Sequence, residues 1–325
     1  MALSSVPCDI KVLDRLIVVN LCVSIWSARK KLTAADFGGA QLPPEDLASW
    51  GSKKICDPES LRIFGTLKSR AVNYLDRLGI RFLNGWAVPD DKAQELHDKL
   101  YLLHNEFSAA KDDFLFSYDQ AVRAWVDKHP GWEQLISTST VSADYVRSRL
   151  GFGWQFFKIA QPDHNAFSEN LVGEVKSLSL TLFDEISKEA RKIWSKVYAG
   201  KTEVSHKALS PLKALHQKLS GLSFVEPRVL PVTDLIEAAM VNLPKRGLIT
   251  GSHLVMLQGL VSMLSDPSLL LEHGQKIING HTTASILSGL TDDASETEFT
   301  DKQNNADSTQ PSAINQQYVD SLGLW

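Results

Sequence analysis

The residues best placed to do chemistry are a row of bases in the middle of the chain. Between residues 188 and 218 the sequence carries eight lysines and arginines against two glutamates. Four of these bases lie at i, i+3, i+4 and i+8 of an expected helix: Lys188, Arg191, Lys192 and Lys196. Such a row can hold the phosphates of a nucleic acid, and each contact adds to a salt-dependent affinity. It can equally be a solvated helix face, or it can receive the acidic segment at the end of the chain.

Two other groups of residues could bind ligands. His97 and His104 lie seven residues apart on one side of an expected helix. A metal site would need further ligands from another element, so we predict surface histidines. The run 145–158, YVRSRLGFGWQFFK, combines aromatic and basic residues, as do the platforms that stack single-stranded bases. The same aromatic residues fit the core side of a strand, and we favour that interpretation.

Motifs with a known catalytic mechanism are missing from the sequence. It has no G-x-x-x-x-G-K-[ST], no G-x-S-x-G, no H-E-x-x-H and no G-x-G-x-x-G after a strand. Cys8, Cys22 and Cys56 form no C-x-x-C pair and leave one cysteine over, which favours a reducing compartment. We therefore predict no catalytic, metal-binding or cofactor-binding residue and favour a non-enzymatic role.

The end of the chain combines an acidic segment with an apolar peptide. The formal net charge is −4, and the stretch from 292 onward carries seven acids and one lysine. The body is therefore near neutral, which counts against a dedicated nucleic-acid binder. Segment 291–317 is too poor in apolar residues to fold, so we predict a disordered linker. The peptide 318–325 should dock in a groove of a partner or of its own chain through Tyr318, Val319, Leu322, Leu324 and Trp325.

Two long helices are expected to position these groups. In the segment 90–128, alternating steps of three and four residues mark one apolar face, interrupted only by Ser117: Ala93, Leu96, Leu100, Leu103, Phe107, Ala110, Phe114, Ala121 and Ala124. A repeat this long predicts a rod that packs on another helix. The segment 166–198 carries a similar stripe and is the expected partner within the chain. A homo-oligomer formed through the first helix is the alternative.

The remaining elements are shorter. Strands are predicted at 16–28, at 80–88 with a bulge at Gly85, and at 154–160, and helices at 57–78, 209–219, 233–242, 252–264 and 267–278. The predicted fold is mostly helical α+β, with a small sheet of about three strands, two long packed, coiled-coil-like helices and a helical C-terminal subdomain. The predicted parts are 1–162, 163–290, the linker 291–317 and the docking peptide 318–325.

The compartment follows from the apolar runs. The longest, 16–26, contains Asn20 and Ser24 and is shorter than the roughly 20 residues of a membrane span. Asp9 and Asp14 precede it where a signal peptide would carry positive charge. We therefore predict a cytoplasmic protein without membrane contact.

Four stretches together resemble a known family. They are IWSARKKL, LGIRFLNGWAVP, HNEFSAAKDDFLFSYDQAVRAW and RSRLGFGWQFFKI. The chain over about 10–290 is similar to the domain of unknown function 3150 family of bacteria, phages and conjugative elements. Members are often encoded beside a MoxR-type AAA+ ATPase and a von Willebrand A or cobaltochelatase-like protein. The resemblance implies a partner role in such a module and supplies no catalytic residues.

Two functions are therefore expected. The leading one is a non-enzymatic adaptor or scaffold that binds the AAA+ ATPase or the von Willebrand A protein of a mobile element. The alternative is a nucleic-acid-binding protein that acts in DNA transfer, recombination or phage defence.

Overall fold

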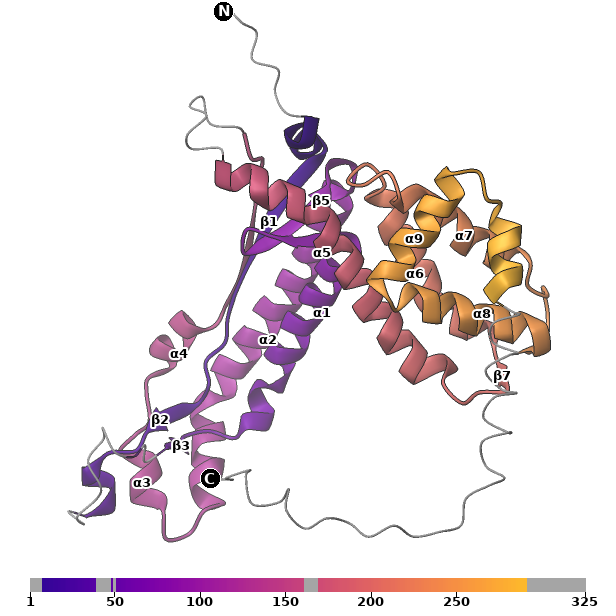
Figure 1. Cartoon of the computed structure of the whole chain (residues 1–325). Helices are drawn as coiled ribbons and strands as arrows, with labels where there is room; N and C mark the ends of the chain where they lie inside the picture. Colours follow the sequence, from indigo (N-terminus) through magenta and orange to yellow (C-terminus); the bar gives the residue numbers. More distant parts are fainter. Residues whose placement is uncertain (1–7, 39–47, 49–50, 161–168, 291–325) are drawn as a thin grey trace, which may run out of the picture.

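The computed structural model describes residues 8–38, 48, 51–160 and 169–290. The predicted linker 291–317 and the docking peptide 318–325, with Tyr318, Val319, Leu322, Leu324 and Trp325, lie outside the described residues. Within them the fold is mostly helical α+β, as predicted, around one small antiparallel sheet (Figure 1).

The sheet has the strand order β4-β5-β1-β6. Its strands are β1 (Leu16–Ser24), β4 (Ile80–Phe82), β5 (Gly85–Pro89) and β6 (Gly151–Phe157). β1 pairs antiparallel with both β5 and β6, so the first predicted strand lies in the middle of the sheet. Val18 and Ala87 point into one core and Val19 and Trp86 into another, because successive side chains of a strand alternate between faces.

The predicted single strand 80–88 with a bulge is wrong, because the chain reverses in its middle. β4 and β5 form a hairpin in which Phe82 pairs with Gly85. The two turn residues, Leu83 and Asn84, have φ values of 45° and 63°, as a type I′ turn requires. A Cβ on Gly85 would lie 2.4 Å from the Val19 carbonyl oxygen, so this position needs glycine. The sheet therefore has four strands rather than three.

One face of the sheet is covered by α1 (Arg62–Leu78) and α2 (Ala93–Asp127). α2 is an unbroken helix of 35 residues, as predicted. The leucine and phenylalanine side chains of its apolar stripe are buried as far as Phe114, but Ser117 is exposed and Tyr118 is buried in its place. A straight helix drifts against a seven-residue repeat, which explains the shift.

The opposite face is covered by α5 (Glu169–Ile193), which continues into a π-helical turn, η6 (Trp194–Tyr198). The prediction that the two long helices pack on each other is wrong. α2 packs on α1 and β6, whereas α5 packs on β4 and on the C-terminal helices. Both faces of the central strands are apolar, so α2 packs on one face of the sheet and α5 on the other.

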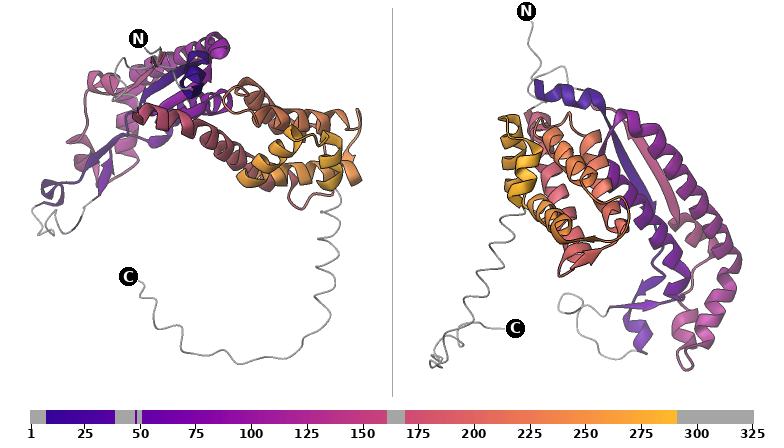
Figure 2. Two further views of the ribbon diagram at one scale, coloured as in Figure 1. Left: turned by 45° about the horizontal axis from the view of Figure 1, so that its top comes forward. Right: turned by 90° about the vertical axis from the view of Figure 1, so that its right-hand side faces the viewer.

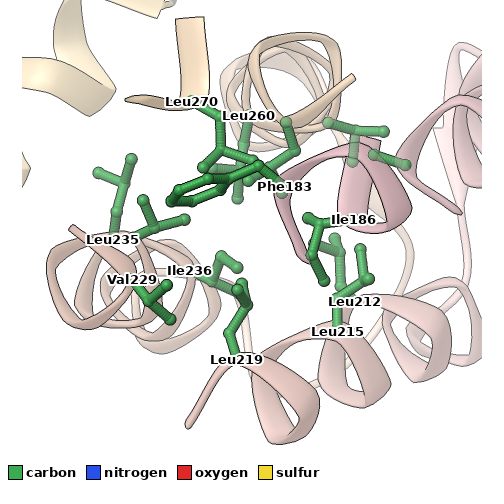
Figure 3. Close-up of a cluster of buried hydrophobic side chains, with 14 of the residues drawn as sticks. Phe183, Ile186, Leu212, Leu215, Leu219, Val229, Leu235, Ile236, Leu260 and Leu270 are labelled. Carbon is green, nitrogen blue, oxygen red and sulfur yellow. The ribbon is translucent and has the colours of Figure 1, made fainter. Parts of the chain in front are cut away.

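The C-terminal part forms a helical lobe against α5 (Figures 1 and 2). It consists of α6 (Ser210–Gly221), α7 (Val229–Val241), α8 (Gly251–Leu264), α9 (Pro267–Ile278) and a helix at 283–290. The four predicted helices of this region are confirmed. Phe183 of α5 lies among leucine, isoleucine and valine side chains of the lobe (Figure 3).

Short elements complete the described chain. They are η1 (Cys8–Arg15), β2 (Arg29–Lys31), η2 (Ala34–Phe37), β3 (Ser52–Lys54), η3 (Pro58–Leu61), η4 (Asp90–Lys92), α3 (Glu133–Ser137), α4 (Ala143–Arg149), β7 (Glu203–Val204), η7 (His206–Leu209) and β8 (Ile249–Thr250). Of the helices described, none is by itself long and apolar enough to cross a membrane; α8 and α9 meet that measure only together, across a bend of 108°.

Candidate functional site

A cleft of about 550 Å³ opens where α1, β4, α5 and α6 meet. Six cationic side chains line it, against three carboxylates. The cations are Arg77, Arg81, Lys188, Lys192, Lys196 and Lys218, and the carboxylates are Asp76, Glu185 and Glu189. The fold thus brings three of the four predicted bases together with two arginines from more than 100 residues earlier in the chain. We call this site the basic cleft.

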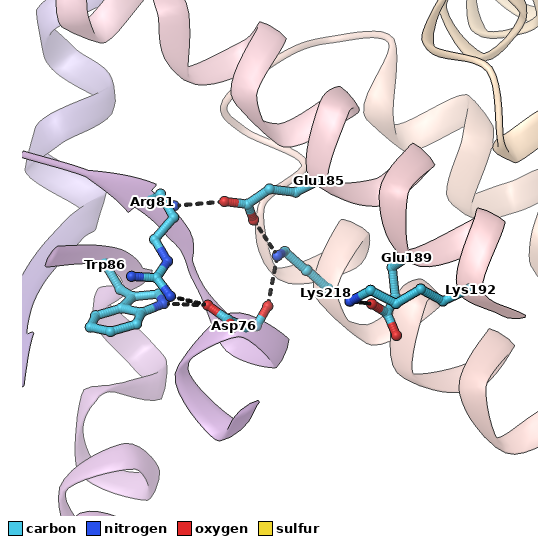
Figure 4. Close-up of polar contacts among 7 residues, drawn as sticks. All are labelled: Asp76, Arg81, Trp86, Glu185, Glu189, Lys192 and Lys218. Carbon is cyan, nitrogen blue, oxygen red and sulfur yellow. Dashed lines mark hydrogen bonds and ion pairs between the residues drawn. The ribbon is translucent and has the colours of Figure 1, made fainter. Parts of the chain in front are cut away.

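A buried ion pair fixes the floor of the basic cleft (Figure 4). The side chain of Lys218 is only 7% exposed, and its Nζ lies 2.7 Å from Glu185 Oε2. The same ammonium donates to the Asp76 carbonyl oxygen at 2.7 Å. The other oxygen of Glu185 accepts from the Arg81 backbone N–H at 3.0 Å. Lys218 is one of the eight bases counted in the sequence between 188 and 218. In the structure it is a buried, paired group that connects α6 to α5 and α1.

A second group of contacts holds Arg81 in the wall of the basic cleft beside β4. The Asp76 carboxylate accepts from the Trp86 indole N–H at 2.7 Å and pairs with Arg81 at 3.1 Å. The Arg81 guanidinium lies over the Trp86 ring, 3.8 Å from its centroid. Carboxylate and aromatic ring together hold Arg81 in place, while half of its side chain stays exposed.

The last turn of α1 places Arg77 at the rim. Its guanidinium lies 5.1 Å from the centroid of the Tyr74 ring. Tyr74 donates to Glu95 of α2 at 2.8 Å. Burial and this carboxylate raise the pKa of Tyr74 to about 12, and the same hydrogen bond lowers the pKa of Glu95. Tyr74 therefore stays neutral and joins α1 to α2 beside the basic cleft.

The lysines on α5 and η6 supply the exposed positive charge of the site. Lys192 pairs with Glu189 at 2.8 Å. Lys188 and Lys196 are exposed and make no ion pair with any residue that the structure describes. Arg191, the fourth predicted base, is exposed but does not line the cleft, because a step of three residues turns it to another side of the helix.

The histidines and the aromatic run serve the packing of β6. His97 is exposed as predicted, but His104 is half-buried, and its Nδ1 lies 2.9 Å from the Phe152 carbonyl oxygen. Its ring lies 5.9 Å from that of Trp154. The run 145–158 forms the end of α4 and β6. Phe152 is buried in the core under α2, and Trp154 and Phe156 are half-buried against it, whereas Tyr145 and Phe157 are exposed, so strand core is correct for only part of the run. No group of three or more His, Cys, Asp or Glu side chains could hold a metal within the described ranges.

A second candidate site is the outer face of α2, opposite its buried stripe. Leu102, Ala109 and Phe116 lie at intervals of seven residues and are all exposed. Leu102 is 55% exposed and Phe116 is 96% exposed. Asp112, Asp113 and Asp119 are exposed one turn from Phe116. Figure 2 shows α2 at the edge of the molecule, with the helical lobe beyond the sheet.

Sequence reasoning missed Phe116 and the two arginines for different reasons. Phe116 could have been found, because it falls opposite the buried stripe of α2. Arg77 and Arg81 gave no local signal, since only the tertiary fold brings the end of α1 and β4 next to α5.

The fold and these sites define a mostly helical α+β protein with a basic cleft and an exposed apolar position on the outer face of α2. The family model "Protein of unknown function (DUF3150)" matches residues 13–266, and the chain belongs to this family. No curated protein and no solved structure matches the chain.

Proposed function

We propose that the protein is a non-enzymatic adaptor that binds a protein partner through the outer face of α2. The observation that carries this proposal is Phe116, which is 96% exposed on a helix of 35 residues. The resemblance of the sequence suggests the partner: a MoxR-type AAA+ ATPase or a von Willebrand A protein of a mobile element or phage.

The energetics favour a protein ligand at this face. Burying a phenylalanine side chain contributes about 1.5–3 kcal/mol, and exposed aromatic residues are the usual anchors of interfaces. The opposite stripe of α2 is packed on α1 and β6, so Phe116 is presented on a rigid element and little order has to be gained on binding. Carboxylates surround Phe116, so the matching surface is an apolar pocket rimmed by lysine or arginine.

A second copy of the chain is the alternative occupant of this face. Each copy would bring Asp112, Asp113 and Asp119 around its own Phe116. Asp112 lies 3.9 Å from Arg147, whereas Asp113 and Asp119 make no ion pair with a described residue. Two such acidic faces repel each other, which favours a basic partner over self-association.

The test uses purified components. The full chain is mixed with the AAA+ ATPase and with the von Willebrand A protein of the same element, and complexes are resolved by size-exclusion chromatography with light scattering. We expect a complex that Phe116→Asp abolishes. The control is Leu180→Asp, an apolar position on α5 that is 60% exposed and lies away from the outer face of α2. A complex unaffected by Phe116→Asp, or a dimer that this substitution dissociates, would contradict the proposal.

Nucleic-acid binding is the second candidate function, and the basic cleft favours it. Its cationic side chains outnumber its carboxylates by six to three. Such a protein would act in DNA transfer, recombination or phage defence. A gel shift that weakens with salt supports this role, whereas no shift at low salt argues against it.

A further inference from the structure

We infer that the basic cleft holds the backbone of a single-stranded nucleic acid and does not read its bases. This inference rests on the second candidate function and names its ligand class. Lys188, Lys192 and Lys196 follow each other at four-residue steps, so they are about 6 Å apart along α5 and its continuation η6. Successive phosphates of an extended single strand have a similar separation.

Charge supports an anionic ligand. Lys218 and Arg81 are neutralised by Glu185 and Asp76 within the described fold. Lys188 and Lys196 have no such partner among the described residues. Lys192 shares its charge with Glu189, which is exposed and can leave it for a phosphate.

Size and lining decide between the forms of nucleic acid. A double helix is too large to enter a cleft of about 550 Å³, whereas the backbone of a single strand is small enough to lie in it. No aromatic side chain of the described residues lines the cleft. The nearby rings of Tyr74 and Trp86 each lie under a guanidinium, of Arg77 and Arg81 respectively. The contacts would then be to the phosphates, which carry no sequence information, so binding should be independent of sequence.

The test measures fluorescence anisotropy of a labelled oligo(dT) of about 15 nucleotides with the full chain, as a function of salt. Three phosphate contacts predict that log K falls with log salt with a slope of about −2. Lys188→Ala and Lys196→Ala should each reduce that slope by about 0.7. The control is Arg191→Ala, which removes the same charge from α5 outside the cleft. Phe116→Asp should leave the affinity unchanged, which separates this site from the outer face of α2.

Three results would overturn the inference. One is an Arg191→Ala variant that weakens binding as much as Lys196→Ala. Another is tighter binding of a duplex of equal length, which would retain the second candidate function but place it outside the cleft. The third is no binding at low salt, as expected if the acidic segment 291–317 occupies the cleft instead.

Discussion

Replacing Lys218 with methionine should destabilise the protein strongly. Methionine keeps most of the aliphatic stem but removes the ammonium that bonds to Glu185 and to the Asp76 carbonyl, each at 2.7 Å. The Glu185 carboxylate and the Asp76 carbonyl oxygen then each lose a hydrogen-bond donor. Water replaces that donor poorly, because the side chain of Lys218 is only 7% exposed. The result is an uncompensated carboxylate at the junction of α5, α6 and α1.

The magnitude follows from the burial of the two partners. Removing one member of a buried ion pair costs about 3–5 kcal/mol. Glu185 is 24% exposed, so water can reach the carboxylate that remains. Glu185 also retains the N–H of Arg81 as a donor. The free energy of unfolding should therefore fall by about 3 kcal/mol, at the low end of the range.

The assay is urea unfolding followed by circular dichroism. Lys213→Met, an exposed position on the same helix, is the control and should change stability by less than about 0.5 kcal/mol. Combining Lys218→Met with Glu185→Gln should cost about 1–3 kcal/mol less than the sum of the two single changes. A loss below about 0.5 kcal/mol for Lys218→Met, or strictly additive changes, would refute a structural role for this pair.

Three further predictions use matched positions. Leu103→Ala should lower the free energy of unfolding, measured in urea, by about 2–5 kcal/mol, because Leu103 is buried. Leu102→Ala, at the exposed neighbouring position, should lower it by less than about 0.5 kcal/mol, and equal losses would contradict the packing of α2. Burial raises the pKa of Tyr198 to about 12, so as the pH rises the unfolded chain loses this proton first. The free energy of unfolding should therefore fall above about pH 10, and Tyr198→Phe should reduce the fall measured by urea unfolding at about pH 11. Gly259→Ala places a Cβ 2.9 Å from a backbone oxygen and should increase hydrogen exchange in the last described helix, whereas Gly65→Ala enters open space and should not.

The helices could be predicted because their signals are local. The stripe from Leu96 to Phe114 and the breakers after Lys128 determine α2, and the structure buries the leucine and phenylalanine side chains of that stripe. The hairpin was missed because its turn is shifted by one residue along the chain from the usual pattern. Asn-Gly is the common central pair of a type I′ turn, and here Asn84 is followed by Gly85, but the two turn residues are Leu83 and Asn84. Leucine with positive φ is uncommon, and it occurs here in the turn that lets β4 pair with β5.

The partners of the long helices could not be predicted, because an apolar stripe does not specify what covers it. α2 and α5 carry similar stripes, and both faces of β1 are apolar where Val18 and Val19 alternate. The charges of the site show the same limit. Counting bases from 188 to 218 treats Lys218 and Lys196 alike, although the fold buries one and exposes the other.

The buried ion pair connects the fold to the proposed site. The bases of the basic cleft come from α5 on one side and from Arg77 and Arg81 on the other. Apolar packing against α5 holds these elements together but is tolerant of small shifts, since it has no direction. The bonds from Lys218 to Glu185 and Asp76 are directional, so they fix the spacing across the cleft. A well-packed apolar replacement of the pair could be as stable, yet it would lose this alignment of the cations on the two sides of the cleft.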